Sequence, residues 1–163
     1  EPTDFLGLNI YHGQVVRPDG TALPEEDPSR VGEPLTAFDW PLTPEALYWG
    51  PKYFFQRYNK PMYITENGIS CRDFPDESGV VSDLQRIAFT EAYLVQLARC
   101  IHEGIPMKGY YHWSLMDNFE WSEGYRERFG LIYVDFQTQK RIIKESGRWY
   151  RSVIEQRGAP LRS

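Results

Sequence analysis

Cysteine, histidine and long apolar runs are scarce in this sequence, and each shortage argues against a class of protein. The two cysteines, Cys71 and Cys100, are too few for a disulfide scaffold, and we predict that both are free thiols. His12, His102 and His112 show no metal-ligand spacing among themselves or with the cysteines, so we expect no metal and no cofactor. No apolar run approaches the roughly 20 residues that span a bilayer, so we expect no membrane partner.

Basic clusters are also missing. The net charge is −5 and no basic stripe is present, which argues against nucleic acid as a partner. At 163 residues and 41% hydrophobic content, the chain is long enough for one domain with a sizeable core. Aromatic residues reach 15%, and flat rings suit the faces of sugars as well as a protein core.

Apolar segments alternate with helical patterns along the chain, which predicts an α/β fold. Apolar runs predict buried strands at residues 5–11, 62–65 and 107–113. Helical periodicity and end signals predict helices at residues 43–59, 82–103 and 146–156. This alternation implies parallel strands joined by right-handed crossovers.

Local signals refine these segments. Ser82-Asp83-Leu84-Gln85 fits a capping box at the start of the second helix. Pro51 lacks a backbone donor and is expected to interrupt or restart the first helix. Residues 17–45 are rich in Pro, Gly and acidic residues and predict a long loop, and residues 129–135 predict a short strand or extended segment.

The segment Tyr63-Ile64-Thr65-Glu66-Asn67-Gly68 delivers one carboxylate to the point where Asn-Gly breaks a strand. A glutamate at the C-terminal tip of a strand is where a (β/α)-barrel enzyme keeps its chemistry, although an ordinary exposed turn residue is the alternative. The carboxyl ends of parallel strands share one face. We therefore expect Asn9 and Tyr11, at the end of the first strand, and Trp113, at the end of the third, to lie near Glu66.

The loop after the third predicted strand adds Glu120 and Trp121 to this face. Carboxylates accept hydrogen bonds from vicinal hydroxyls, and indoles cover the C–H face of a pyranose, so the set suits a polyhydroxylated ring. Retaining glycoside hydrolysis needs a nucleophilic carboxylate, for which Glu66 is the candidate, and Tyr11 can donate to its ionised form. The alternatives are a core tyrosine at Tyr11, a solvated charge at Glu120 and barrel-top packing at Trp113.

Four stretches carry a resemblance to a known family. They are DFLGLNIY at 4–11, PMYITENG at 61–68, GYYHWSLMDNFEW at 109–121 and RFGLIYVDFQTQKR at 128–141. In this order they resemble the C-terminal part of glycoside hydrolase family 1, the β-glucosidase family. The resemblance implies an α/β fold that is the C-terminal part of a (β/α)₈ TIM barrel, with the three strands as its sixth, seventh and eighth. Residues 1–163 would then form a C-terminal segment of the catalytic barrel, without the N-terminal strands.

The resemblance also implies roles for the residues that bind and attack the sugar. Glu66 would be the catalytic nucleophile, Tyr11 would donate its hydroxyl to that carboxylate, and Asn9 would help to order the site. The acid/base glutamate of the family lies in a Thr-Phe-Asn-Glu-Pro motif on the fourth strand, and no such motif occurs here. The isolated chain is therefore expected to be inactive.

The substrate implied by the resemblance is an unphosphorylated β-D-glucoside, with β-galactosides or β-fucosides possible. Glu120 would bind the hydroxyls at C4 and C6, Trp121 would bind a neighbouring hydroxyl, Trp113 would form the floor under the ring, and Phe129 would line the pocket. Relatives that act on 6-phosphorylated glycosides carry a Ser-x-x-Lys-x-Tyr clamp. Here Glu127 and Phe129 occupy the Lys and Tyr positions, and neither suits phosphate.

Three strands without the rest of a barrel would leave two open edges. We therefore expect the chain to need an N-terminal barrel fragment or to self-associate. The chain starts Glu1-Pro2-Thr3, which we interpret as a cut inside a longer protein, so localisation cannot be read from it. The alternatives to a glycosidase part are a non-catalytic fragment or a sugar-binding half-barrel. A metal-dependent barrel hydrolase is disfavoured because the strand tips carry too few His and Asp ligands.

Overall fold

The computed structural model of the chain describes residues 3–14, 16–24 and 31–161. Strands and helices alternate in the first two thirds, as β1 (Leu6–Asn9), α1 (Ala46–Tyr58), β2 (Met62–Asn67), α2 (Leu84–His102) and β3 (Met107–His112). A short 3₁₀ helix (Trp121–Glu123) then precedes β4 (Ile132–Val134), β5 (Arg141–Ile143) and α3 (Glu145–Glu155). The predicted strands and helices are confirmed. The antiparallel pairing of β4 with β5 was not predicted.

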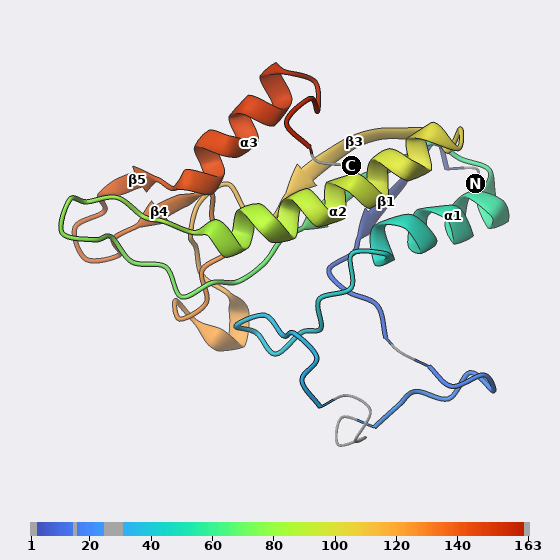
Figure 1. Cartoon of the computed structure of the whole chain (residues 1–163), viewed down its shortest axis with the longest axis horizontal. Coiled ribbons are helices and arrows are strands. Elements are labelled where there is room, and N and C mark those ends of the chain that lie inside the picture. Colours follow the sequence, from blue (N-terminus) through green and yellow to red (C-terminus); the bar gives the residue numbers. More distant parts are fainter. Residues whose placement is uncertain (1–2, 15, 25–30, 162–163) are drawn as a thin grey trace.

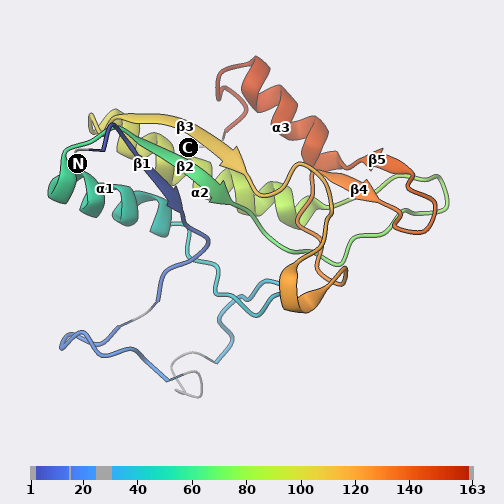
Figure 2. The same cartoon turned by 180° about the vertical axis from the view of Figure 1, so that it is seen from behind.

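β1, β2 and β3 form a parallel sheet with β2 in the centre. The register pairs Asn9 with Glu66 and Asn67 with His112, so the carboxyl ends of the three strands meet at one edge of the sheet. Helices α1 and α2 cover one face of the sheet, whereas the opposite face carries no helix from the described part of the chain (Figures 1 and 2). This arrangement confirms the predicted parallel α/β fold.

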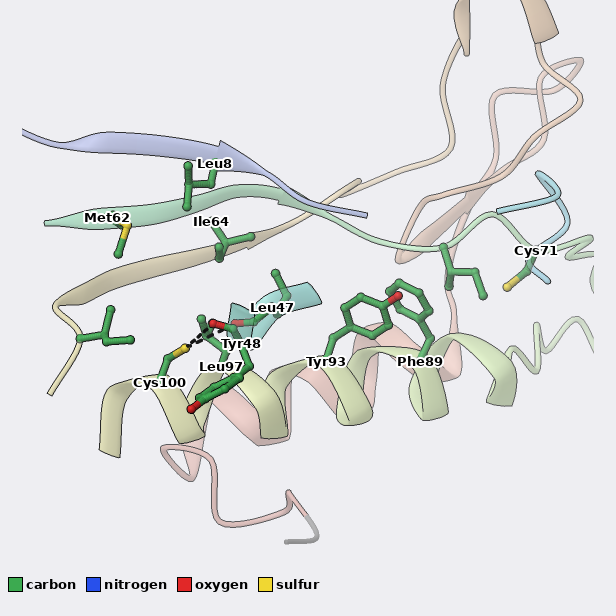
Figure 3. Packing of buried hydrophobic residues seen from close by; sticks show 12 residues of the cluster. Leu8, Leu47, Tyr48, Met62, Ile64, Cys71, Phe89, Tyr93, Leu97 and Cys100 are labelled. Carbon is green, nitrogen blue, oxygen red and sulfur yellow. Dashed lines mark hydrogen bonds between the residues drawn. The ribbon is translucent and has the colours of Figure 1, made fainter. Parts of the chain in front are cut away.

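An apolar core lies between the sheet and these two helices (Figure 3). Met62 and Ile64 of β2 have no exposed surface, and they pack in one cluster with Leu8 of β1, Leu47 of α1 and Tyr93 of α2. Burying one such side chain contributes roughly 1.5–3 kcal/mol. Apolar burial therefore fixes the strand that carries Glu66.

Pro51 does not interrupt the first helix, so that prediction is wrong. α1 is continuous through Pro51, which is buried. The ring removes the donor that would have bonded the Leu47 carbonyl. The buried thiol of Cys100, on α2, donates instead to the carbonyls of Leu47 at 3.7 Å and Tyr48 at 3.2 Å. A partner from another helix thus satisfies the backbone that the proline leaves free.

The capping box predicted at the start of α2 is also wrong. The N-cap residue is Asp83, and no side chain caps the helix. Ser82 Oγ donates instead to Glu145 Oε2 at 2.6 Å, at the start of α3. The Asp83 carboxylate pairs with the buried Arg86 and accepts from Ser146 N at 2.8 Å. Contacts with α3, more than local capping, define this helix start.

The long loop between β1 and α1 contains two isolated antiparallel bridges, Val16 with Ala22 and Leu35 with Pro41, and no helix or longer strand in its described parts. The prediction of a loop over residues 17–45 is confirmed there, and residues 25–30 lie outside the described ranges. Cys71 and Cys100 are both free, as predicted, and both are buried. Among the described residues, no helix is long and apolar enough to cross a bilayer.

Candidate active site

Glu66 lies near the carboxyl end of β2, inside the strand and not after it. The Tyr11 hydroxyl donates a hydrogen bond of 2.9 Å to Glu66 Oε2. Asn9 pairs with Glu66 in the strand register, but its side-chain oxygen accepts from Thr65 Oγ1 at 2.7 Å. The structure therefore brings Tyr11 to the Glu66 carboxylate as predicted, while Asn9 contacts the neighbouring threonine.

The electrostatics of the site keep Tyr11 protonated. Burial raises the pKa of the Tyr11 phenol, and its hydrogen bond to Glu66 and the charges of Glu66 and Glu120 raise it further. Burial also raises the pKa of Glu120; a hydrogen bond from the Trp113 side chain opposes this, and the charges of Glu66 and Glu127 add to it. The charges of Glu66 and Glu127 thus act on Glu120, and the Tyr11 phenol remains a donor to Glu66.

Trp113 follows β3 directly, and its backbone N–H donates to Asn67 O at 2.8 Å. A Cβ at Gly68 would lie 1.8 Å from the Trp113 carbonyl oxygen, so only glycine fits there. The Asn-Gly that follows Glu66 is therefore needed for a close approach between the ends of β2 and β3. That approach brings the backbone of Trp113 against Asn67 and Gly68, the two residues that follow Glu66.

Phe129 and Trp121 have different positions. Phe129 is 3% exposed, and its ring centroid lies 6.3 Å from that of Tyr11 in an edge-on contact. Trp121 starts the 3₁₀ helix and is 79% exposed. Phe129 therefore lies buried against Tyr11, whereas Trp121 lies on the surface of the described part of the chain.

Trp40 was not among the predicted site residues. Its ring lies 5.0 Å from Tyr11, 6.3 Å from Phe129 and 4.6 Å from Phe38, measured between centroids. Together with His12, Trp40 also lines a hollow of about 610 Å³. In the sequence it is an aromatic residue in a loop rich in Pro and acidic residues, and nothing local links it to the end of β1.

No group of three or more His, Cys, Asp or Glu side chains within the described ranges could hold a metal ion. The chemistry available from these residues is that of a carboxylate with a phenol donor, a second carboxylate held by an indole, and aromatic walls. Parallel strands that gather such groups at their carboxyl ends are typical of barrel enzymes that act on sugars.

The comparisons with known proteins agree with this class. Residues 1–159 match the model of glycosyl hydrolase family 1, and the chain belongs to this family. It is 46% identical over 159 residues to beta-glucosidase A of Thermotoga maritima. The match covers 97% of this chain and 36% of the relative. A beta-glucosidase of Agrobacterium sp. is 43% identical over 92% of this chain and 34% of its own length.

The structural comparisons agree. A solved family 1 β-glucosidase from Thermotoga maritima superposes with a TM-score of 0.87 at 44% identity, over 97% of this chain and 36% of that one. The enzyme from the same organism in complex with glucoimidazole superposes with a TM-score of 0.86 at 47% identity, over 95% of this chain and 35% of the other. The chain thus spans about one third of the length of the relatives that it matches.

Proposed function

We propose that this chain supplies the nucleophile-bearing part of a retaining β-glucosidase that hydrolyses terminal unphosphorylated β-D-glucosides. The observation that carries the proposal is the 2.9 Å hydrogen bond from Tyr11 to Glu66 at the carboxyl end of the parallel sheet. The β-glucosidase relatives support the same reaction class, and the relative solved with glucoimidazole supports a sugar as the ligand.

In this mechanism the ionised Glu66 attacks the anomeric carbon of the sugar. A bond forms between a carboxylate oxygen and C1, the bond from C1 to the aglycone oxygen breaks, and that oxygen takes a proton from an acid/base carboxylate. Water, deprotonated by the same carboxylate, then releases the sugar with retention of configuration. Tyr11 remains a hydrogen-bond donor and orients the attacking carboxylate.

The substrate side of the site combines Glu120, Trp113 and Phe129. Glu120 would accept hydrogen bonds from the C4 and C6 hydroxyls, and Trp113 both bonds Glu120 and offers its indole to the sugar face. Trp121 would bind a neighbouring hydroxyl from its exposed position. Asn9 would support the end of β2 through Thr65.

The charge of Glu127 favours an unphosphorylated sugar as the substrate. It is buried, accepts a hydrogen bond from Ser70 Oγ and pairs with Arg126 at 3.0 Å. Its negative charge reaches Glu120, whose pKa it raises. A second fixed negative charge beside the C6 end of the sugar would repel a 6-phosphate.

The acid/base carboxylate and the remaining strands would come from a partner. We infer that β1, β2 and β3 are the sixth to eighth strands of the barrel and that an N-terminal segment pairs with the open edges of β1 and β3. Beside β3, an apolar hollow of about 380 Å³ between α2 and α3 is available to this segment. Without a general acid, which contributes roughly 10²–10⁴-fold, the isolated chain would be inactive.

The test uses a completed barrel, in which the N-terminal portion of the Thermotoga maritima relative that this chain does not match is joined to this chain. We expect this barrel to hydrolyse 4-nitrophenyl β-glucoside and Glu66→Gln to abolish turnover with an unchanged circular dichroism spectrum. Glu77→Gln, which changes an exposed loop carboxylate, is the matched control. Turnover retained by Glu66→Gln would remove Glu66 as the nucleophile.

A non-catalytic role is the second candidate, favoured by the absence of an Asn-Glu-Pro segment from the sequence. Titration calorimetry of the isolated chain with glucose separates the two candidates. Glucose binding by the isolated chain, together with an inactive completed barrel, would identify a sugar-binding half-barrel.

Sedimentation gives the association state of the isolated chain. A well-folded monomer at every concentration would contradict the need for a partner or for self-association.

A further inference from the structure

The loop that carries the proposed sugar-binding residues has little regular structure of its own. Between β3 and β4 it contains one short 3₁₀ helix, and all of its residues are described. The side chain of Asp117, in the first half of the loop, has no exposed surface and accepts four hydrogen bonds. They come from Gly130 N at 3.0 Å, Lys144 Nζ at 2.9 Å, Arg128 Nη1 at 2.6 Å and Val134 N at 3.3 Å. One carboxylate therefore ties the beginning of the loop to its end.

Lys144 connects this loop to the loop that follows β2. Its side chain has no exposed surface, and Nζ contacts Asp73 Oδ2 at 2.5 Å and Asp117 Oδ1 at 2.9 Å. A buried ammonium is tolerated only when its charge is paired and its donors are satisfied, and here the two carboxylates come from two different loops. The position of Lys144, directly before α3, adds the helix as a third attachment point.

A second link runs parallel to the first. Arg86, also without exposed surface, pairs with Asp73 at 2.7 Å and donates to the carbonyl of Arg128 at 2.7 Å. The same carbonyl accepts from Cys71 N at 3.1 Å. The segment after Glu66 and the loop that carries Glu120 are therefore joined twice by buried polar groups.

We propose that Lys144 is a positioning residue. Through Asp73 and Asp117 it sets the place of the Glu120 loop relative to Glu66, and thereby the preference of the site at C4 of the sugar. This inference rests on the proposed function, in which Glu120 accepts the C4 and C6 hydroxyls. Lys144 touches no sugar, because it is buried between the loops. A displacement of about 1 Å in a substrate-positioning group can lower a rate about 10²-fold, so a cation that locks the loop also controls selectivity.

The experiment compares variants of the completed barrel with two substrates that differ only at C4, 4-nitrophenyl β-glucoside and 4-nitrophenyl β-galactoside. We expect Lys144→Met to lower kcat/KM for the glucoside about 10²-fold and to move the glucoside-to-galactoside ratio toward one. Lys144→Arg keeps the charge and should restore much of the ratio. Arg151→Met, which removes an exposed cation from α3, should leave both values unchanged.

A second variant combines Lys144→Met with Asp117→Asn. It removes one charge of each sign, so the buried charges around Lys144 stay balanced, and it serves as a backup if Lys144→Met does not fold. A ratio equal to that of the unmodified barrel in folded Lys144→Met would overturn the proposal. Joint loss of fold and activity in both variants would also overturn it, since that is the behaviour of a purely structural network. An unmodified barrel that is correctly folded but inactive would instead refute the proposed function, and the inference would fall with it.

Discussion

The face of the parallel sheet under α1 and α2 and the loops at the carboxyl ends of its strands are held by different forces. We call the first the apolar end and the second the ionic end. Under α1 and α2 the packed side chains are mostly apolar (Figure 3), and Met62 and Ile64 have no exposed surface. At the carboxyl ends of the strands, the buried groups that join the loops are charged, with Asp117, Lys144 and Arg86 at the centre. Apolar burial is non-directional and places whole elements, whereas ion pairs are directional and place individual side chains.

This difference suits a site at the end of a sheet. The apolar end determines where β2 lies, and therefore where the backbone of Glu66 lies. The ionic end determines the path of the irregular loop between β3 and β4, and therefore its position relative to Glu66. Within the described residues, the buried network contains three carboxylates and three cations, so its charges balance: Asp73, Asp83, Asp117, Arg86, Arg128 and Lys144.

The largest expected effect comes from breaking the ionic end. Asp117→Ala removes the common partner of Lys144 and Arg128 and leaves buried positive charge uncompensated. We expect the free energy of unfolding of the completed barrel to fall by about 3–5 kcal/mol, measured by urea denaturation. Glu155→Ala, which removes an exposed carboxylate from α3, is the control. A loss below about 1 kcal/mol for Asp117→Ala would mean that the network does not hold this end.

The next effect concerns His112, which ends β3 beside the network. Burial, with repulsion from Arg86, lowers the pKa of His112 to about 3. The folded-state pKa lies below the unfolded value of about 6.5, so the unfolded chain binds more protons between these values and stability falls as the pH drops through that range. Between pH 7 and pH 5, His112 should account for about 2 kcal/mol of lost stability.

Two variants isolate this contribution from that of the carboxylates. In His112→Phe, the loss of stability of the completed barrel between pH 7 and pH 5 should be smaller than in the unmodified barrel, as measured by urea denaturation at both pH values. His102→Phe changes an exposed histidine and serves as the control. Equal pH dependence in the His112 variant and the unmodified barrel would show that this histidine does not titrate as the buried network requires.

An effect of similar size is expected at the contact of Tyr11 with Glu66, where the loop after β1 meets the end of β2. Tyr11→Phe removes one hydrogen bond to a charged group, worth about 1.5–3 kcal/mol, so kcat/KM should fall about 10–150-fold. Initial rates with 4-nitrophenyl β-glucoside measure the change, and Tyr53→Phe, at an exposed position on α1, is the control. An unchanged kcat/KM would show that the phenol does not act on Glu66, the proposed nucleophile.

The apolar end should tolerate a small change without consequence for selectivity. Ile64→Val removes one methylene from a fully buried side chain and should cost about 0.5–1.5 kcal/mol in the free energy of unfolding. The glucoside-to-galactoside ratio should not change, because the loops are placed by the ionic end. A shift in this ratio as large as that expected for Lys144→Met would show that the apolar end also controls selectivity.

The sequence predicts the apolar end better than the ionic end, for a physical reason. Strand and helix positions follow from apolar periodicity, and parallel strands bring Tyr11, Glu66 and Trp113 to one edge without knowledge of any contact. Trp40 could not be found this way, because its place beside Tyr11 depends on how a long loop folds back. The buried pairing of Lys144 is equally hidden, since its partners lie 27 and 71 residues away.

The same reason explains the two errors at the helices. Pro51 is accommodated because Cys100, from another helix, bonds the carbonyls near it, and no local pattern contains that information. The capping box at Ser82 is a sound local signal, but Glu145 takes the serine hydroxyl. In both cases a tertiary contact overrides a local preference.

The smallest expected effect sharpens this last point. Ser82 is exposed and does not cap α2, so Ser82→Ala should change the free energy of unfolding by less than about 0.5 kcal/mol. Replacement of a true N-cap serine by alanine would lower the free energy of unfolding by about 1 kcal/mol. Urea denaturation of the completed barrel can distinguish these two losses. Asp83→Ala, at the neighbouring position, removes the buried partner of Arg86 and Ser146 and should cost several times more. Equal losses of stability in the two variants would show that local capping by Ser82 defines the start of α2. They would also contradict the claim that buried charges organise the ionic end.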